Sequence, residues 1–262
     1  MSRYIQFAVI RFKSKTAYRF DYFLGILNTL LSFVVYYSIY KALYSGQSYI
    51  DGVSFSMVTT SFLISLGLGS AFHKNEMFLQ DKIKQGTIAN ELLKPVNFKL
   101  RMLFEDAGEG AFNVVFNFLP TAVIAALFAH LSTPSGALDL ILCIASVMLG
   151  YIVLWQISFI VQSLSFWLFS VWGLVTIKNV LINIFAGAYI PMWFMPERIR
   201  SILHFTPFDS IYFMPVQLYL GQLNEMQVAL GFAKQLVWIA VLYVIGEVCW
   251  RCGIKRLVVQ GG

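Results

Sequence analysis

Six long runs of apolar residues decide what this chain can fold into. Each is close to the roughly 20 residues that a helix needs to cross the hydrocarbon core of a bilayer. Because lipid offers no partner to an unpaired backbone group, runs of this length must become helices. The sequence therefore predicts an all-α integral membrane protein with six transmembrane helices. The expected spans cover residues 22–43, 53–72, 107–131, 138–164, 174–190 and 228–250.

Composition and pattern argue against a soluble protein and against a membrane barrel. Only 12% of the 262 residues are charged, whereas a soluble domain carries about 25%, so a water-facing surface could not be covered. The strands of a transmembrane barrel alternate apolar and polar residues, but these runs are apolar throughout. We treat residues 1–262 as a single membrane domain.

The border between the fourth and fifth expected spans is the least defined part of the sequence. Residues 151–190 contain few breaks beyond Gly173. Because this region is too long for one span, we divide it at Ser165–Gly173, in the sequence SFWLFSVWG. One long helix followed by a re-entrant piece is the poorer alternative.

Lysine and arginine residues are distributed unevenly between the two sides of the membrane. Fifteen of the nineteen fall before the first span, between the second and third, at the join of the fourth and fifth, or after the sixth. Since basic residues are retained on the cytosolic side, both termini are predicted to lie in the cytosol. The net charge of +6 then reflects topology, and we expect no nucleic-acid partner. The four remaining basic residues are Lys41, Arg198, Arg200 and Lys234.

The segment before the first span, residues 1–20, is predicted to form an amphipathic helix along the cytosolic interface. Apolar residues fall near one helical face and basic residues fall on another, so the basic face would meet anionic headgroups. A role as a topology anchor alone stays open. The apolar face has Ile5, Ala8, Val9, Phe12 and Phe20, and the basic face has Arg11, Lys15 and Arg19.

Motifs that carry catalysis are nearly absent. No glycine is followed by lysine, so the chain has no P-loop for ATP, and the G-x-S-x-G nucleophile elbow is missing as well. The three histidines have no ligand neighbour at helical spacing, and the pair Cys249 and Cys252 is a weak metal or redox signal. We therefore expect no enzyme activity, no metal site and no cofactor in this chain.

Five charged residues lie within or beside the expected spans. A charge at the middle of the bilayer costs about 2.5–3.5 kcal/mol on insertion scales, but these five lie toward the cytosolic third, where long side chains can reach water. We expect structural pairing of Lys178 with one of the carboxylates, in preference to a transport role. The five residues are Lys178, Glu105, Asp106, Glu109 and Glu247.

A short polar segment, Ile83–Arg101, interrupts the apolar runs between the second and third spans. Gly86 breaks the chain, and Thr87 is suited to cap the helix that follows. Glu91 in the first turn suits a helix N-terminus, and Pro95 ends the helix because the residue before a proline disfavours helical geometry. The segment thus predicts a rigid cytosolic rod of about two turns, with a headgroup anchor as the alternative.

Three stretches carry a resemblance to a known family. QGTIANELLKPVNF, residues 85–98, resembles the cytosolic coupling segment of type-two ABC transporter permeases, which carry a G-T-x-x-x-L-L-x-x-P-like string between their second and third spans. GAYIPMWFMPERIRSILHFTPF, residues 187–208, resembles the end of the fifth span in that family, with Met195 at the position of a family phenylalanine. MPVQLYLG, residues 214–221, resembles the ending before the sixth span. With the six spans, the resemblance covers nearly the whole chain.

The resemblance implies the permease subunit of an ATP-driven exporter in the bacterial cytoplasmic membrane. Such a permease pairs with a second permease, identical or homologous, and with two ABC ATPase subunits that bind ATP and Mg. Its ATPase-coupling residues would be Gln85, Gly86, Thr87, Glu91, Leu92, Leu93 and Pro95, with Arg11 and Lys15 on the interfacial helix. Re-entrant outer helices between the fifth and sixth spans would contain Gly187, Pro191, Pro196 and Pro207.

Two other classes of function stay open at this point. A self-sufficient secondary transporter or channel would transport or conduct without nucleotide. A membrane-embedded enzyme or assembly factor would require a polar cluster buried inside the helix bundle.

Overall fold

The computed structural model describes residues 2–16, 19–72 and 76–257, apart from the side chains of residues 2 and 19–22. His73 and the side chains of Arg19 and Phe20 therefore lie outside the described part of the chain. Within it, the regular elements are helices except for a two-stranded hairpin, in which β1 (Tyr49–Ile50) pairs antiparallel with β2 (Val53–Ser54). The predicted all-α class is confirmed.

Four helices in the described residues are long and apolar enough to cross a bilayer. They correspond to the first, third, fourth and sixth expected spans. They are α2 (Arg19–Tyr44), the continuous helix Phe98–Phe128, α8 (Ala137–Ser163) with the 3-10 turn η2 (Leu164–Phe166), and α12 (Glu225–Ile254).

The second and fifth expected spans are shorter helices, α3 (Phe55–Ala71) and α9 (Trp172–Phe185). At 1.5 Å per residue, their 17 and 14 residues extend about 26 Å and about 21 Å, less than the roughly 30 Å of the hydrocarbon core. The division of the chain at Ser165–Gly173 is confirmed, because η2 ends and α9 begins within it. The helix ends at Phe185 instead of residue 190, and Gly187 then turns the chain with a φ of +88°.

The third long helix begins earlier than hydropathy predicts. α6 (Phe98–Asn113) starts directly after Asn97, whose Oδ1 accepts a hydrogen bond from the Leu100 amide at 3.0 Å. The helix therefore extends nine residues before the expected start of the span at residue 107, and charged side chains in this extension, such as Arg101 and Glu105, find partners inside the protein. A π-helical turn, η1 (Val114–Phe118), joins α6 to α7 (Leu119–Phe128). It stands just before Pro120, whose missing N–H and ring do not fit a regular α-helix.

Between α3 and α6 the chain forms two short helices, α4 (Phe78–Lys84) and α5 (Ile88–Leu92), which we call the α4–α5 hairpin. The predicted break at Gly86 is confirmed by its φ of +68°. The predicted cap is wrong, because Thr87 has helical backbone angles and its hydroxyl donates to the Lys82 carbonyl at 3.4 Å. The rod is therefore a bent pair of short helices, of which the sequence indicated only the second.

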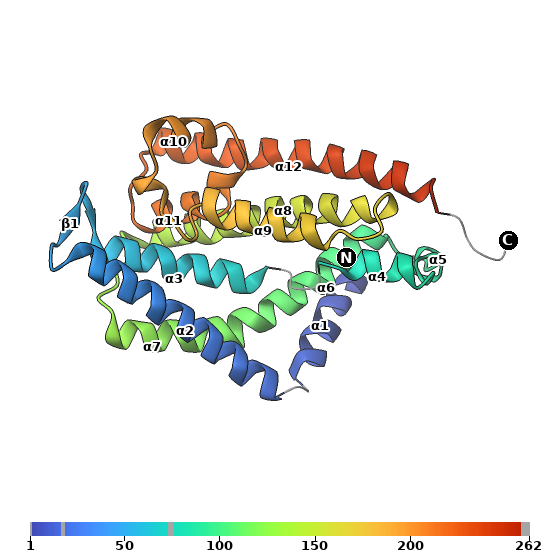
Figure 1. Cartoon of the computed structure of the whole chain (residues 1–262), viewed down its shortest axis with the longest axis horizontal. Helices are drawn as coiled ribbons and strands as arrows, with labels where there is room; N and C mark the ends of the chain where they lie inside the picture. The colour runs from blue at the N-terminus through green and yellow to red at the C-terminus, as the bar shows by residue number, and fades with distance from the viewer. Residues whose placement is uncertain (1, 17–18, 73–75, 258–262) are drawn as a thin grey trace.

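Four short helical pieces connect α9 to α12 at the end of the bundle that carries β1, opposite the α4–α5 hairpin (Figure 1). Pro191 and Pro196 stand directly before the first two of them, as expected for residues that cannot continue a long helix. The last, α11, packs against α8 and buries most of its side chains. The four are η3 (Met192–Phe194), α10 (Glu197–Leu203), η4 (Phe208–Ser210) and α11 (Phe213–Tyr219).

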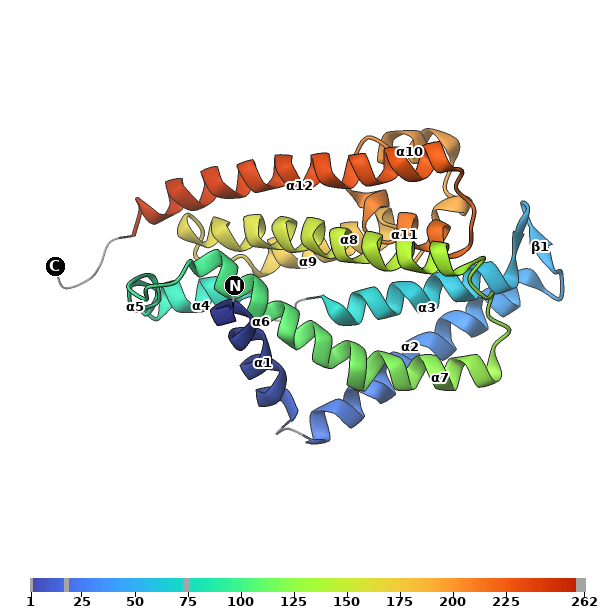
Figure 2. The same cartoon turned by 180° about the vertical axis from the view of Figure 1, so that it is seen from behind.

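The N-terminal helix α1 (Ser2–Thr16) runs across the direction of α8 and α12 in both views and packs on α6 (Figure 1 and Figure 2). The contact is close, because a Cβ at Gly108 of α6 would overlap the backbone of Ala8. A helix before the first span is confirmed over Ser2–Thr16, whereas residues 19 and 20 of the expected helix belong to α2. The apolar residues of α1 do not share one environment. Ala8 faces α6, whereas Ile5 and Val9 are exposed.

The two ends of the bundle give a direct test of the expected topology. Ser48 beside β1 and Lys84 at the end of α4 are both exposed and lie at opposite ends (Figure 1). In a chain whose native cysteines are replaced by serine, we expect Ser48→Cys to react with an impermeant maleimide in intact cells. Lys84→Cys should react only after permeabilisation, and the opposite pattern of labelling would show that the topology is inverted.

Candidate functional site

Glu91 on α5 is the centre of an ion cluster at the hairpin end of the bundle. Its Oε2 lies 2.6 Å from Lys94 Nζ and 2.6 Å from Arg101 Nη1, and its Oε1 lies 3.4 Å from Lys82 Nζ. These partners belong to α4, to the segment after α5 and to α6, so one carboxylate ties three segments together. Arg101, whose side chain is only 6% exposed, also reaches Glu105 at 3.2 Å.

The surroundings of Glu91 favour its charged form. Burial alone would raise the pKa of this carboxyl, but hydrogen bonds from Lys94 and Arg101 outweigh burial and lower the pKa from 4.5 to about 2. Because the pKa is depressed in the folded chain, the carboxylate stabilises the fold above its ordinary pKa. That stabilisation is lost as the pH falls from about 4.5 through about 2.

Behind the ion cluster, the α4–α5 hairpin packs on an aromatic core. Ile88 is 2% exposed and belongs to a cluster of side chains from α6, α8 and α12. Phe98 stacks on Trp250 with ring centroids 5.1 Å apart, and Phe159 lies 5.5 Å from the same indole. The core joins the hairpin to three of the long helices, so a displacement of the hairpin must move against their ends.

The other hairpin residues expected to couple to an ATPase are brought together by the structure. Leu93 is 82% exposed at the tip, and Gln85, Gly86 and Pro95 are exposed around it. Leu92 packs partly against the aromatic core. The hairpin therefore has one face anchored in the protein and one face open.

Arg11 and Lys15 on α1 lie apart from this tip. Arg11 Nη2 is 2.8 Å from Glu109 Oε2, and Lys15 Nζ is 2.8 Å from Glu109 Oε1. Glu109 is 4% exposed on α6, and a buried carboxylate requires counter-charges. Both basic side chains are therefore paired with Glu109 inside the protein, and each remains more than a third exposed.

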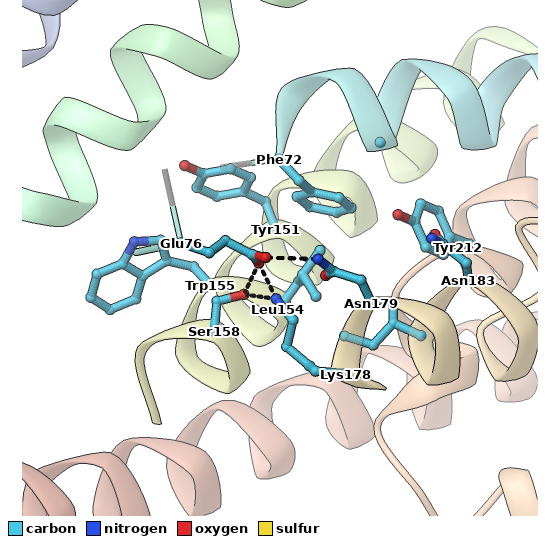
Figure 3. A pocket seen from close by; sticks show the side chains of 12 residues that line it. Phe72, Glu76, Tyr151, Leu154, Trp155, Ser158, Lys178, Asn179, Asn183 and Tyr212 are labelled. Carbon is cyan, nitrogen blue, oxygen red and sulfur yellow. Dashed lines mark hydrogen bonds and ion pairs between the residues drawn. The ribbon is translucent and has the colours of Figure 1, made fainter. Parts of the chain in front are cut away.

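A second polar site lies inside the bundle, where the turn before α4 meets α8 and α9 (Figure 3). Lys178 on α9 forms an ion pair with Glu76 in that turn and donates a hydrogen bond to Ser158 Oγ on α8 at 2.8 Å. Asn179 Nδ2 donates to the other oxygen of Glu76 at 2.7 Å. One carboxylate thus connects the entry to the hairpin with two of the neighbouring helices.

The predicted partner of Lys178 is wrong. None of the four expected carboxylates reaches it, because each has another contact in the folded chain. Glu76 was not predicted as the partner of Lys178. Its position as the first carboxylate after the second expected span is the sequence feature that could have indicated it. The other contacts are Glu105 with Arg101, Asp106 with Trp155 Nε1, Glu109 with Arg11 and Lys15, and Glu247 with Lys99 and Arg251.

One hollow adjoins this ion pair, and a second hollow adjoins the first. The first, about 230 Å³, is bordered by Glu76 and Lys178, and its wall includes the aromatic side chains of Phe72, Tyr151, Trp155 and Tyr212 (Figure 3). The second, about 240 Å³, shares Gly69, Asn183 and Tyr212 with the first. Its remaining wall consists largely of hydroxyl and amide side chains of α2 and α3, and no charged residue in the described part of the chain lines it. Together they make a polar face on α2, α3 and α9.

The opposite end of the bundle has a separate ion cluster. Asp209 on η4 lies 2.5 Å from Lys234 Nζ on α12 and 2.8 Å from His204 Nδ1. The four residues expected in the outer exit segment all stand at turns or directly before helical pieces. They are Gly187, Pro191, Pro196 and Pro207.

Comparison with known proteins gives a family match. Residues 22–261 match a family whose description is ABC-2 family transporter protein. The matched region contains the elements from β1 to α12 and most of α2. No curated protein and no solved structure matches the chain. Among the described residues, no group of three or more His, Cys, Asp or Glu side chains could hold a metal ion.

Replacing Glu91 with glutamine tests the ion cluster, because the change removes the charge that neutralises buried Arg101. We expect the free energy of unfolding to fall by about 2–3 kcal/mol at pH 7, seen as a lower Tm of the purified chain in detergent. At pH 3 the difference from wild type should shrink by more than half, since protonation removes much of the same stabilisation.

Asp81→Asn is the matched control, because Asp81 is an exposed carboxylate on the same hairpin. It should leave the Tm almost unchanged at both pH values. A Glu91→Gln effect that is equal at pH 7 and pH 3 would contradict the assignment of the charge as the stabilising feature.

Proposed function

Because this chain belongs to the ABC-2 family of transporter proteins, we propose that it is the permease subunit of an ATP-driven exporter. Permeases of this family are not catalytic themselves and work with ABC ATPases, so we assign ATP hydrolysis to two partner subunits. In the proposed arrangement α3 and α9 act as the second and fifth of six spans. Both termini lie in the cytosol of a bacterium, and a second permease, identical or homologous, completes the membrane part.

The α4–α5 hairpin is the observation that carries this proposal. Its inner face is held by Ile88 in the aromatic core and by Glu91 in the ion cluster. Its tip leaves Leu93 82% exposed, beside exposed Lys94. A partner that covers Leu93 removes apolar surface from water, which favours binding. The anchored inner face holds the hairpin in position against that partner. These features support docking of an ATPase on the tip.

A push on the hairpin can reach the membrane helices by two routes. The first runs through Arg101 and the aromatic core to α6, α8 and α12. The second runs through Glu76, just before α4, to Lys178 and Asn179 on α9. Because α9 borders both polar hollows, the second route is suited to change their shape when the hairpin moves.

The polar face of α2, α3 and α9 supports a place for the substrate and the second permease. Asn28 on α2 and Asn179 on α9 are exposed there, and polar side chains are unfavourable against hydrocarbon. We therefore place the second permease against this face, with the substrate between the two subunits. The outer segment with Pro191 and Pro196 would then form the exit.

Leu93→Asp tests the proposed docking site. A buried carboxylate would be unfavourable in the interface, so we expect at least a tenfold loss of the ATPase that co-purifies with tagged wild-type permease, about 1.4 kcal/mol. Ser48→Asp, an exposed change at the opposite end of the bundle, should retain the ATPase. Wild-type levels of ATPase on Leu93→Asp would exclude the tip as the docking site.

The Glu76–Lys178 pair is tested by removing both charges. Glu76→Gln alone leaves buried Lys178 without a counter-charge and should destabilise the chain by about 3–5 kcal/mol, whereas Glu76→Gln with Lys178→Met should restore most of the loss. The contribution of the pair to the second route is measured by the rate of maleimide labelling at Val180→Cys, an exposed position on α9, in the complex of the permease with its ATPase.

We expect ATP with vanadate to change the labelling rate in the wild-type background and not in the double variant. If ATP changes the rate equally in both, the pair has a structural role only and the second route is wrong.

A further inference from the structure

A groove on the outside of the bundle has no role in the proposed transport cycle. It encloses about 420 Å³ between the start of α6, the later half of α8 and the later half of α12. These three helices come together at the hairpin end of the bundle (Figure 2). The wall is largely apolar and includes Leu100, Leu103, Ile152, Leu236 and Ile239.

The groove opens away from the protein. Leu100, Leu236 and Tyr243 line it and are 42%, 55% and 60% exposed. All three belong to helices that are long and apolar enough to cross a bilayer, and α6 and α12 take no part in the polar face assigned to the second permease. An unfilled apolar hollow forfeits dispersion contacts, so in a bilayer it must take up an acyl chain.

Charged side chains stand at the mouth of the groove nearest the hairpin. Lys99 on α6 binds one oxygen of Glu247, and Arg251 Nε lies 2.6 Å from the other. Two cations against one carboxylate leave one positive charge in excess. The side chain of Arg251 is 75% exposed, and no described residue accepts a hydrogen bond from its Nη groups.

Gln156 supplies a second polar feature deeper in the groove. Lys99 Nζ lies 5.1 Å from the ring centroid of Phe159, and Gln156 is three residues earlier on the same helix, so it lies about one turn below the mouth. It is 6% exposed, and its Oε1 has no hydrogen-bond partner among the described residues. Its Nε2 also forms no hydrogen bond with a described residue, and an unpartnered N–H donor in an apolar wall is unfavourable, which indicates a ligand with a hydrogen-bond acceptor at this depth.

We propose that this groove binds an anionic phospholipid from the leaflet on the hairpin side, which is the cytosolic leaflet in the proposed topology. The phosphodiester lies between Arg251 and Lys99, an ester carbonyl of the glycerol region accepts a hydrogen bond from Gln156 Nε2, and an acyl chain fills the apolar wall. The excess positive charge selects an anionic headgroup, as basic pockets between membrane helices do on the cytosolic side. Glu247 holds the two cations in place. The site depends on the membrane location of the chain and not on ATPase coupling.

The test measures phospholipid that remains on the full chain after extensive washing in mild detergent, by mass spectrometry, against the composition of the source membrane. We expect phosphatidylglycerol to be retained and enriched on the wild-type chain. Arg251→Gln should lower the retained phosphatidylglycerol about fivefold. Lys255→Gln, which removes an exposed cation outside the groove on the same helix end, should leave it unchanged.

A second pair of variants tests the acyl-chain part of the site without altering charge. Ala240→Trp fills the groove, whereas Ala229→Trp adds the same bulk at an exposed position of α12 outside it. We expect only Ala240→Trp to lose the lipid. Equal loss in both, retained lipid with the composition of the source membrane, or retained zwitterionic lipid unaffected by Arg251→Gln would each overturn the proposal.

Discussion

Pairing of buried charges at one end of the bundle is the interaction on which the rest of the structure depends. Arg101, Glu109 and Lys178 are at most 8% exposed among largely apolar helices, and a buried charge without a partner is strongly destabilising. Their partners lie on α5, on α1 and in the turn before α4. The same contacts that let these charges enter the helices therefore also fix α1 and the α4–α5 hairpin in place.

This arrangement gives the two ends of the molecule different properties. The hairpin end is a connected block, because ion pairs and the aromatic core join α1, α4, α5, α6, α8 and α12. The other end is closed by short helical pieces that Asp209 and Lys234 tie to α12. Between them, α3 and α9 are shorter than the other apolar helices and border the polar hollows. A displacement of the hairpin end would therefore act on α3 and α9, which are shorter than the neighbouring membrane helices.

Local sequence features predicted those parts of the fold that depend on neighbours in the chain. The break at Gly86, the division at Ser165–Gly173 and the positions of Pro191 and Pro196 follow from backbone preferences. The start of α6 was missed because hydropathy treats each charged residue as unfavourable, whereas Arg101 and Glu105 are paired in the folded chain. The cap at Thr87 was missed because its hydroxyl turns back to Lys82.

By itself the sequence determined that this chain is a helical membrane protein, because long apolar runs in lipid leave the backbone no other way to satisfy its hydrogen bonds. It also determined the family, through short strings whose residues are adjacent in the chain. Only the tertiary structure decided which charges meet. Lys178 and Glu76 are 102 positions apart and Arg11 and Glu109 are 98 apart. Such pairs form only when the helices pack, since the energy of an ion pair depends on distance in space and on burial.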